Sequence, residues 1–323
     1  MINQIFNEDC IAGLKQLPGE SVNCCVTSPP YYGLRDYGHA GQIGLEETPD
    51  SYVQKLVEVF SEVKRVLRDD GTLWLNLGDS YAGGGKKGDT EGAKQKTSKG
   101  ATWGTNDRLA TLKSKINGVK PKDLIGIPWM VAFALRADGW YLRQDIIWYK
   151  RNPMPESVTD RCTKAHEYIF LLSKSAKYYY DHEAIFEEAN YDGRKDTVMK
   201  GSEKYKNGFA PTDTNPNTLA VVGHERWKNK IGDLPARNKR SVWDVTTKSY
   251  SGAHFATYPE DLIAPCIKAG CPENGVVLDP FMGAGTTAVV SRKLNRNYVG
   301  FELNEKYIKI ANKRLYSELG MFL

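Results

Sequence analysis

The segment "GVVLDPFMGAGTTAVVSRKLNRNYVGFEL", residues 275–303, alternates between patterns typical of strands and of a helix. An apolar run at 275–279 leads into a glycine-rich turn, a helical pattern over 286–294 and a second apolar run at 298–303. Strand, tight turn, helix and strand form the repeating unit of a parallel sheet. The segment therefore predicts an α/β fold in which helices cover both faces of a doubly wound, mostly parallel sheet.

The flanking sequence continues this alternation and then interrupts it. Helical spacing marks 11–17, 51–67, 127–137, 259–269 and 305–315, whereas strand patterns mark 22–26, 72–80, 140–149 and 167–175, with a break at Asp70-Gly71. Residues 183–245 are irregular and rich in Gly, Asn, Lys and Trp. We therefore expect three parts, in which 1–182 and 246–323 share one sheet and 183–245 is inserted between them.

The charge of the chain is unevenly distributed. The net charge is +5, yet residues 83–122 hold ten Lys or Arg against three Asp or Glu, and residues 190–250 hold twelve against seven. Such basic, polar segments are typical of a polyanion-binding surface, although solvated loops would have the same composition. Residues 83–100 contain almost no apolar side chains, so we expect the basic loop at 83–109 to be mobile.

Other features of the composition restrict the protein's class. The sequence has no signal-peptide pattern and no apolar run approaching 18 residues, which predicts a chain without a membrane span. Its six cysteines show no CxxC pair and no Cys/His ligand spacing. We therefore expect reduced thiols, a cytoplasmic location and no metal site.

The glycine turn predicts a nucleotide-type ligand. Gly283, Gly285 and Ala288 satisfy the loose dinucleotide fingerprint, and Glu302 at the next strand end is placed to accept both ribose hydroxyls. Asp279 argues against NAD, because a carboxylate just before the turn would repel a pyrophosphate. It suits an ammonium group, while Thr286 and Thr287 at the helix N-terminus suit a carboxylate. An amino acid joined to a nucleoside describes S-adenosylmethionine; the alternative is that Asp279 only caps the turn.

The segment "VTSPPYYG", residues 26–33, predicts a second functional element. A short buried strand runs into Ser28, Pro29, Pro30 and Tyr31. Proline fixes its own φ and donates no hydrogen bond, so this strand must end in a rigid loop. Such a loop can present a backbone carbonyl and a ring face to a flat molecule.

Together these two motifs resemble those of the amino-methylating DNA methyltransferases. "DPFMGAGTT" at 279–287 is similar to the family's element for the methyl donor, and "SPPY" at 28–31 is similar to its catalytic element. The order of the two resembles the permuted β group, in which the target-recognition region lies between them. The resemblance covers nearly the whole chain, and it implies S-adenosylmethionine as cofactor and double-stranded DNA as partner.

The resemblance also implies roles for individual residues. Phe281 would pack on the donor's adenine, and Asp9 would contact the adenine amino group, although Asp9 suits a helix N-cap equally well. Backbone near Phe255 and Thr257 would approach the donor's methionine end. Ser28, Pro29, Pro30 and Tyr31 would clamp a base flipped out of the duplex. Phosphate contacts or base reading would fall to basic residues of the insertion: Arg194, Lys195, Arg226, Lys228, Arg237, Lys239 and Arg240.

The sequence leaves the product open between N4-methylcytosine and N6-methyladenine. Serine at position 28 favours cytosine N4 within this family, but either base offers an equivalent amine. Methylation at cytosine C5 would need a nucleophilic cysteine, and Cys266 lies in an expected helix, with no partner glutamate in a comparable loop. Methylation of RNA and a non-catalytic DNA- or NAD-binding role remain alternatives. The chain is expected to be a monomer or homodimer, with a cognate restriction endonuclease acting separately.

Overall fold

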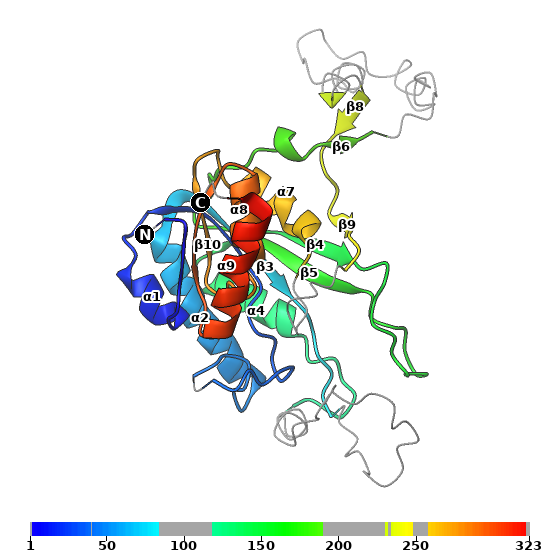
Figure 1. Cartoon of the computed structure of the whole chain (residues 1–323). Coiled ribbons are helices and arrows are strands. Elements are labelled where there is room, and N and C mark those ends of the chain that lie inside the picture. Colours follow the sequence, from blue (N-terminus) through cyan, green and yellow to red (C-terminus); the bar gives the residue numbers. More distant parts are fainter. Residues whose placement is uncertain are drawn as a thin grey trace, which may run out of the picture. The chain divides into compact units, whose positions relative to one another are not determined.

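The computed structural model describes residues 2–39, 41–83, 118–189, 230–231, 234–247 and 258–320. It divides into two compact units, one made of Met1–Tyr180 with Ser241–Leu323 and the other of Asp181–Arg240 (Figure 1). Most of the expected basic loop at 83–109 and much of the expected insertion at 183–245 lie outside the described residues.

An eight-stranded sheet forms the centre of the larger unit. Its order is β1 (Gln4–Phe6), β11 (Asn297–Phe301), β10 (Val276–Asp279), β2 (Val22–Thr27), β3 (Leu67–Leu77), β5 (His166–Ser173), β4 (Tyr141–Tyr149) and β9 (Val242–Asp244). All neighbours pair in parallel except that β5 runs antiparallel to both β3 and β4. The expected mostly parallel α/β fold is confirmed. As a consequence, the start of β5 lies at the same edge as the carboxyl ends of the other strands.

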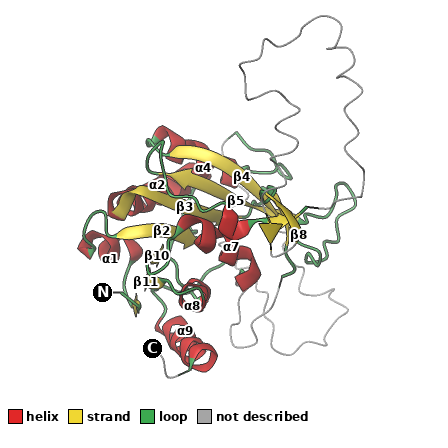
Figure 2. Ribbon diagram, turned by 90° about the horizontal axis from the view of Figure 1, so that it is seen from above, coloured by secondary structure: helices red, strands yellow, loops and turns green. Residues whose placement is uncertain are grey.

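Two helical layers cover this sheet. On one face α1 (Cys10–Gln16), α2 (Pro49–Val66) and α4 (Ile127–Ala137) pack side by side, and on the other lie α7 (Glu260–Gly270), α8 (Thr286–Lys293) and α9 (Glu305–Leu319) (Figure 2). Side chains spaced along α2, such as Leu56, Phe60 and Val63, are fully buried against the sheet. A second cluster joins α8 and α9 to β11 through Val289, Tyr298 and Leu315.

The start of β3 differs from the sequence expectation. We expected a break at Asp70-Gly71 and a strand from Thr72, but β3 begins at Leu67, directly after α2. Val22 of β2 pairs with Leu67 and Cys24 pairs with Thr72, so the residues between Leu67 and Thr72 form a register shift. The polar Asp-Gly pair therefore bulges within the strand instead of ending an element.

The smaller unit contains the 3-10 turn Glu183–Ile185 and a three-stranded sheet. The sheet's order is β6 (Glu187–Glu188), β8 (Leu234–Arg237) and β7 (Lys230–Ile231), with antiparallel pairing. The Glu187 carboxylate pairs with both Arg237 and Arg240 within this unit. Across both units, none of the described helices has the length and apolar character that crossing a membrane requires.

Candidate active site

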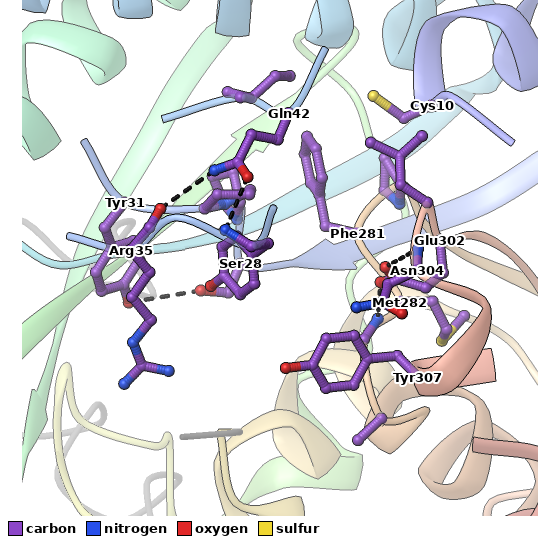
Figure 3. Close-up of a pocket in the computed structure, with 18 of the residues that line it drawn as sticks. Cys10, Ser28, Tyr31, Arg35, Gln42, Phe281, Met282, Glu302, Asn304 and Tyr307 are labelled. Atoms are coloured by element: carbon purple, nitrogen blue, oxygen red, sulfur yellow. Dashed lines mark hydrogen bonds between the residues drawn. The ribbon is translucent and has the colours of Figure 1, made fainter. Parts of the chain in front are cut away.

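A cavity of about 640 Å³ opens at the carboxyl edge of the large sheet. It is lined from the loop after β2, from the turn between β10 and α8, and from the segment after β11. Figure 3 shows Ser28 and Tyr31 on one side and Glu302, Asn304 and Tyr307 on the other, with Phe281 between them in this view. Two motifs some 250 residues apart in the sequence therefore meet in one cavity.

The loop after β2 is held in place by contacts with α2 and with the end of β3. The Tyr52 hydroxyl of α2 donates to the Pro30 carbonyl at 2.8 Å, and Tyr52 is fully buried. A Cβ at Gly78 would lie 2.6 Å from the Tyr31 ring, so glycine at this position leaves room for that ring. Ser28 Oγ lies 3.5 Å from the Tyr31 hydroxyl. The expected stiff loop is thus reinforced by packing as well as by its two prolines.

A polar network extends from Tyr31 across the sheet edge. The Tyr31 hydroxyl lies 2.8 Å from Glu167 Oε2 and 3.2 Å from Asn76 Oδ1. The other oxygen of Glu167 pairs with Lys150, and the Lys150 and Glu167 side chains are only 18% and 16% exposed. Lys150 Nζ also lies 4.2 Å from the centroid of the Trp148 ring. Burial, reinforced by the Glu167 charge, raises the pKa of the Tyr31 hydroxyl well above its ordinary value.

Sequence reasoning missed this network, and the topology explains why. Asn76 lies near the carboxyl end of β3 and Lys150 directly follows β4, whereas Glu167 lies at the start of β5. Only the antiparallel direction of β5 brings its first residues to the edge where the parallel strands end. Polar residues at the ends of these strands can be seen in the sequence. The strand order that brings them together cannot, so the network was not predicted.

The other half of the cavity is built around Glu302. Its two carboxylate oxygens accept the backbone N–H groups of Gly283 at 2.9 Å and Asn304 at 2.8 Å. Burial raises the pKa of Glu302 above its ordinary value. Gly283 has φ +53°, a conformation that favours glycine, and lines the cavity together with Phe281 and Thr286. This carboxylate therefore fixes the glycine turn while facing the space where a ligand would lie.

Asp279 lies beneath the cavity and not in its wall. Its carboxylate is 1% exposed and accepts hydrogen bonds from the hydroxyls of Thr27 and Thr287 at 2.6 Å and of Tyr258 at 2.9 Å, and from the Phe281 N–H at 3.0 Å. Burial raises the pKa of Asp279. The carboxylate joins the ends of β2 and β10 to the start of α8. Its direct contact with an ammonium group stays a prediction, whereas this structural role is observed.

Asp9 is a helix N-cap that also lines the cavity. It is the N-cap of α1, where its Oδ1 accepts the N–H groups of Ile11 and Ala12 at 3.0 Å each. It also lines the cavity. Capping and ligand contact are therefore compatible, because one carboxylate oxygen serves both backbone donors.

The loop that follows Tyr31 completes the wall. Gln42 Oε1 accepts the Tyr37 N–H at 2.7 Å, and its Nε2 donates to the Arg35 carbonyl at 3.2 Å. Arg35, Tyr37 and Gln42 all line the cavity, and Arg35 and Gln42 are labelled among its residues in Figure 3. None of these residues was singled out from the sequence, because the loop carries no repeating pattern.

The expected site residues divide into three groups. Nine line the cavity: Asp9, Ser28, Pro29, Pro30, Tyr31, Phe281, Gly283, Thr286 and Glu302. Three support it without lining it, namely Asp279, Gly285 and Thr287. Gly285, at φ +80°, lets α8 approach α9, where an added Cβ would lie 2.7 Å from Ala311. Phe255 and Thr257 fall outside the described residues, as do the basic candidates from Arg194 to Lys228.

Cys266, the alternative nucleophile, has an environment unlike that of a reactive thiol. It is 1% exposed within α7, and its Sγ lies 3.7 Å from the Leu262 carbonyl. All six cysteines lie within the described residues, where no disulfide joins them, and only Cys162 is exposed. The geometry therefore gives no support to a cysteine-based attack.

A family model and curated relatives match most of the chain. The model of the DNA methylase family of N6 and N4 methyltransferases matches residues 22–313. The type II methyltransferase M.Cfr9I of Citrobacter freundii is 46% identical over 314 residues, covering 97% of this chain and 88% of that protein. M.SmaI of Serratia marcescens is 44% identical over 312 residues, covering 97% and 90%.

Solved structures share the fold at lower identity. The PvuII cytosine-N4-specific DNA methyltransferase aligns with a TM-score of 0.61 and 16% identity, over 96% of this chain and 85% of that one. A putative DNA modification methylase of Thermus thermophilus, complexed with S-adenosyl-L-methionine, aligns with a TM-score of 0.56 and 21% identity, over 97% and 93%. The expected methyltransferase fold is thereby confirmed.

Proposed function

Because the chain belongs to the DNA methylase family of N6 and N4 methyltransferases, we propose that it methylates the exocyclic N4 of a cytosine flipped out of duplex DNA. The methyl donor is S-adenosylmethionine, as the family and the complexed structural neighbours indicate. Methylation of adenine N6 by the same mechanism is the second candidate, since the family includes both activities.

One observation carries the proposal: a single cavity contains both the loop Ser28–Tyr31 and the turn Phe281–Gly283 with Glu302. Methyl transfer needs the acceptor nitrogen in line with the bond that breaks, in a site that excludes water. A cavity that is aromatic on one wall and carries a carboxylate on the next suits a nucleoside. A rigid loop at its other end suits a flat base.

The cavity residues fit the donor in chemistry. Phe281 offers a ring face to adenine, Glu302 offers carboxylate oxygens to the ribose hydroxyls, and Asp9 offers a carboxylate to the adenine amino group. When bound, the donor supplies a methyl group on an electrophilic sulfonium, so the protein needs no group that activates the leaving atom. The task of the chain is to bind, orient and exclude water.

The base would be held by the loop after β2. The amine of a base is a weak nucleophile, because its lone pair is conjugated with the ring. Hydrogen bonds from its N–H groups to the Ser28 hydroxyl and the Pro29 carbonyl favour sp³ geometry and stabilise the positive charge that develops on nitrogen. The Pro30 carbonyl is already held by Tyr52. Tyr31, fixed through Glu167, provides the stacking surface.

The choice of cytosine rests on Ser28. The family resemblance favours serine for cytosine N4, and the hydroxyl can donate or accept as the ring requires. The PvuII enzyme carries cytosine-N4 specificity in its name, but at 16% identity that likeness concerns the fold alone. Ser28 is therefore the residue that favours cytosine over adenine.

DNA contacts are assigned to the basic segments. We assign target recognition to residues 183–245 and phosphate contacts to the basic loop at 83–109. Of the candidate residues that the structure describes, Arg237 and Arg240 pair with Glu187, so they would need to exchange that partner for a phosphate. A monomer or homodimer in a reducing cytoplasm, alongside a separately acting cognate endonuclease, completes the proposal.

Product analysis tests the proposal. The purified chain is incubated with unmethylated bacterial DNA and S-adenosylmethionine, and the DNA is digested to nucleosides and weighed. We expect N4-methylcytosine with the wild-type chain and much less of it with Ser28→Ala after the same incubation time. N6-methyladenine as the only product would overturn the cytosine assignment and leave the amino-methylation mechanism standing. An unmodified digest would contradict both.

A further inference from the structure

The connection between β4 and β5, residues 150–165, is anchored where it begins to the segment that contains β9. Arg151 pairs with Asp244 of β9 through Nη2 at 2.5 Å and Nε at 2.7 Å. Asn152 Nδ2 donates to the Thr247 carbonyl at 3.1 Å, and Asn152 Oδ1 accepts the Thr247 N–H at 2.9 Å. The first residues of this connection are therefore fixed to the neighbouring segment.

Contacts between its own residues also hold the connection together. The Lys150 N–H donates to the Ala165 carbonyl at 2.8 Å, and Arg161 pairs with Glu156 at 2.5 Å. The Arg161 guanidinium lies 3.9 Å from the centroid of the Tyr81 ring. These contacts hold the loop as a stiff projection at the edge where the cavity opens.

Met154 is presented by this projection to solvent and to the cavity at once. Its exposed fraction is 69%, the largest among the exposed large hydrophobic residues in the described part of the chain, and it lines the cavity that contains Ser28 and Tyr31. Pro153 and Pro155 flank it and restrict the backbone on both sides. Scattered exposed apolar side chains are ordinary. An exposed methionine held between prolines at the entrance of a base-binding cavity is a more specific arrangement.

Base flipping leaves a gap in the stacked duplex. Proteins that bend DNA insert apolar side chains between base steps, among them methionine, leucine and proline. A side chain of the same kind fits the gap that a flipped base leaves. Methionine is unbranched and polarizable, so it adapts to irregular aromatic surfaces. We infer that Met154 enters the DNA stack at the position that the target base leaves. This inference rests on the proposed function, because it assigns a positioning residue for the same flipped base.

Leu34 is the competing candidate. It lies three residues after Tyr31, is 46% exposed and lines the same cavity. It lies on the loop that Gln42 holds through Arg35 and Tyr37, and it has no prolines beside it. Met154 is the more exposed of the two and belongs to the more strongly braced segment.

The test compares two DNA duplexes that contain the sequence methylated in cells expressing the wild-type chain. In one, the target base is normally paired; in the other, it lies opposite an abasic site and is already unpaired. Single-turnover methylation rates are measured for the wild type and for Met154→Ala, Met154→Leu, Leu34→Ala and Val158→Ala. Val158 is the matched control, because it is exposed on the same connection (37%) and does not line the cavity.

We expect Met154→Ala to lower the rate on the paired duplex roughly 10- to 100-fold, and Met154→Leu to stay within about threefold of the wild type. On the abasic duplex Met154→Ala should recover to within about threefold, because flipping no longer breaks a base pair. The inference would be overturned if Met154→Ala lost rate equally on both duplexes or lost none on either. It would also be overturned if only Leu34→Ala were slow on the paired duplex and recovered on the abasic one. If DNA from cells expressing the wild-type chain contains no methylated sequence, the proposed function fails, and this inference fails with it.

Discussion

The Tyr31 hydroxyl lies 2.8 Å from a carboxylate oxygen of Glu167, 136 residues further along the chain. Tyr31 belongs to the loop after β2, and Glu167 belongs to the antiparallel strand β5. Lys150 pairs with the other Glu167 oxygen, so the loop after β2 is connected to the ends of β4 and β5. The ring that would stack on the target base thus has a fixed orientation before the base arrives.

Replacing Glu167 with glutamine should impair turnover more than donor binding. Glutamine keeps an oxygen for the Tyr31 hydroxyl but loses the charge that pairs with Lys150, leaving a mostly buried ammonium without its partner. We expect kcat to fall about 10- to 100-fold while the dissociation constant of S-adenosylmethionine changes little. The control is Asp160→Asn, which removes an exposed pair with Lys122. Equal losses in kcat and donor affinity would contradict a role confined to the base side.

Donor affinity should depend on Glu302 and on pH. Burial raises the Glu302 pKa, so protonation of this carboxylate begins at a higher pH than for an ordinary glutamate. As pH falls through that raised pKa, the anionic acceptor is lost and affinity for the donor should decrease. Glu302→Gln should bind roughly 10- to 100-fold more weakly, since hydrogen bonds to charged groups contribute about 1.5–3 kcal/mol, and its affinity should not vary over this pH range. Calorimetry measures both effects.

The control for Glu302 is Glu305→Gln. Glu305 lies at the start of α9, is 68% exposed and forms an ion pair with Lys309 one helical turn later. Its replacement should leave donor affinity and its pH dependence unchanged. A Glu302→Gln variant that keeps the wild-type pH profile would show that another group titrates.

The two roles of Asp9 can be separated by substitution. Serine caps a helix about as well as aspartate, whereas alanine does not, and loss of a cap costs about 1 kcal/mol. Asp9→Ser should therefore preserve the free energy of unfolding and weaken donor binding, while Asp9→Ala should lower both. Chemical denaturation and calorimetry provide the two measurements. If Asp9→Ser binds the donor as tightly as the wild type does, Asp9 acts only as a helix cap.

Asp279→Ala should destabilise the fold. The substitution leaves three hydroxyl groups and one backbone N–H without their shared buried acceptor. Unsatisfied buried donors cost about 1–3 kcal/mol each, so a loss on the order of 3 kcal/mol or more in the free energy of unfolding is expected. Urea denaturation measures it, with the exposed Glu273→Ala as control. A stability equal to that of the wild type would show that these donors find other partners.

Local patterns in the sequence predicted most of the large unit. The strand, turn and helix around Asp279, and the proline-terminated strand before Ser28, have signals within a few residues of each other. No local pattern predicts that Glu167 and Lys150 meet, because their contact depends on the antiparallel direction of β5. Burial of Asp279 was missed for a related reason. Its donors Thr27 and Tyr258 come from distant segments that the sequence does not align.

Ser28→Ala separates donor binding from methyl transfer, if one cavity binds the donor at one end and clamps the base at the other. Calorimetry gives the dissociation constant for S-adenosylmethionine, and a single-turnover assay gives the rate of methyl transfer to DNA. We predict a dissociation constant within about threefold of the wild type and a rate lowered roughly 100-fold or more, the scale for loss of a hydrogen bond that acts in the transition state. Methyl transfer at the wild-type rate would show that the Ser28 hydroxyl does not hold the base.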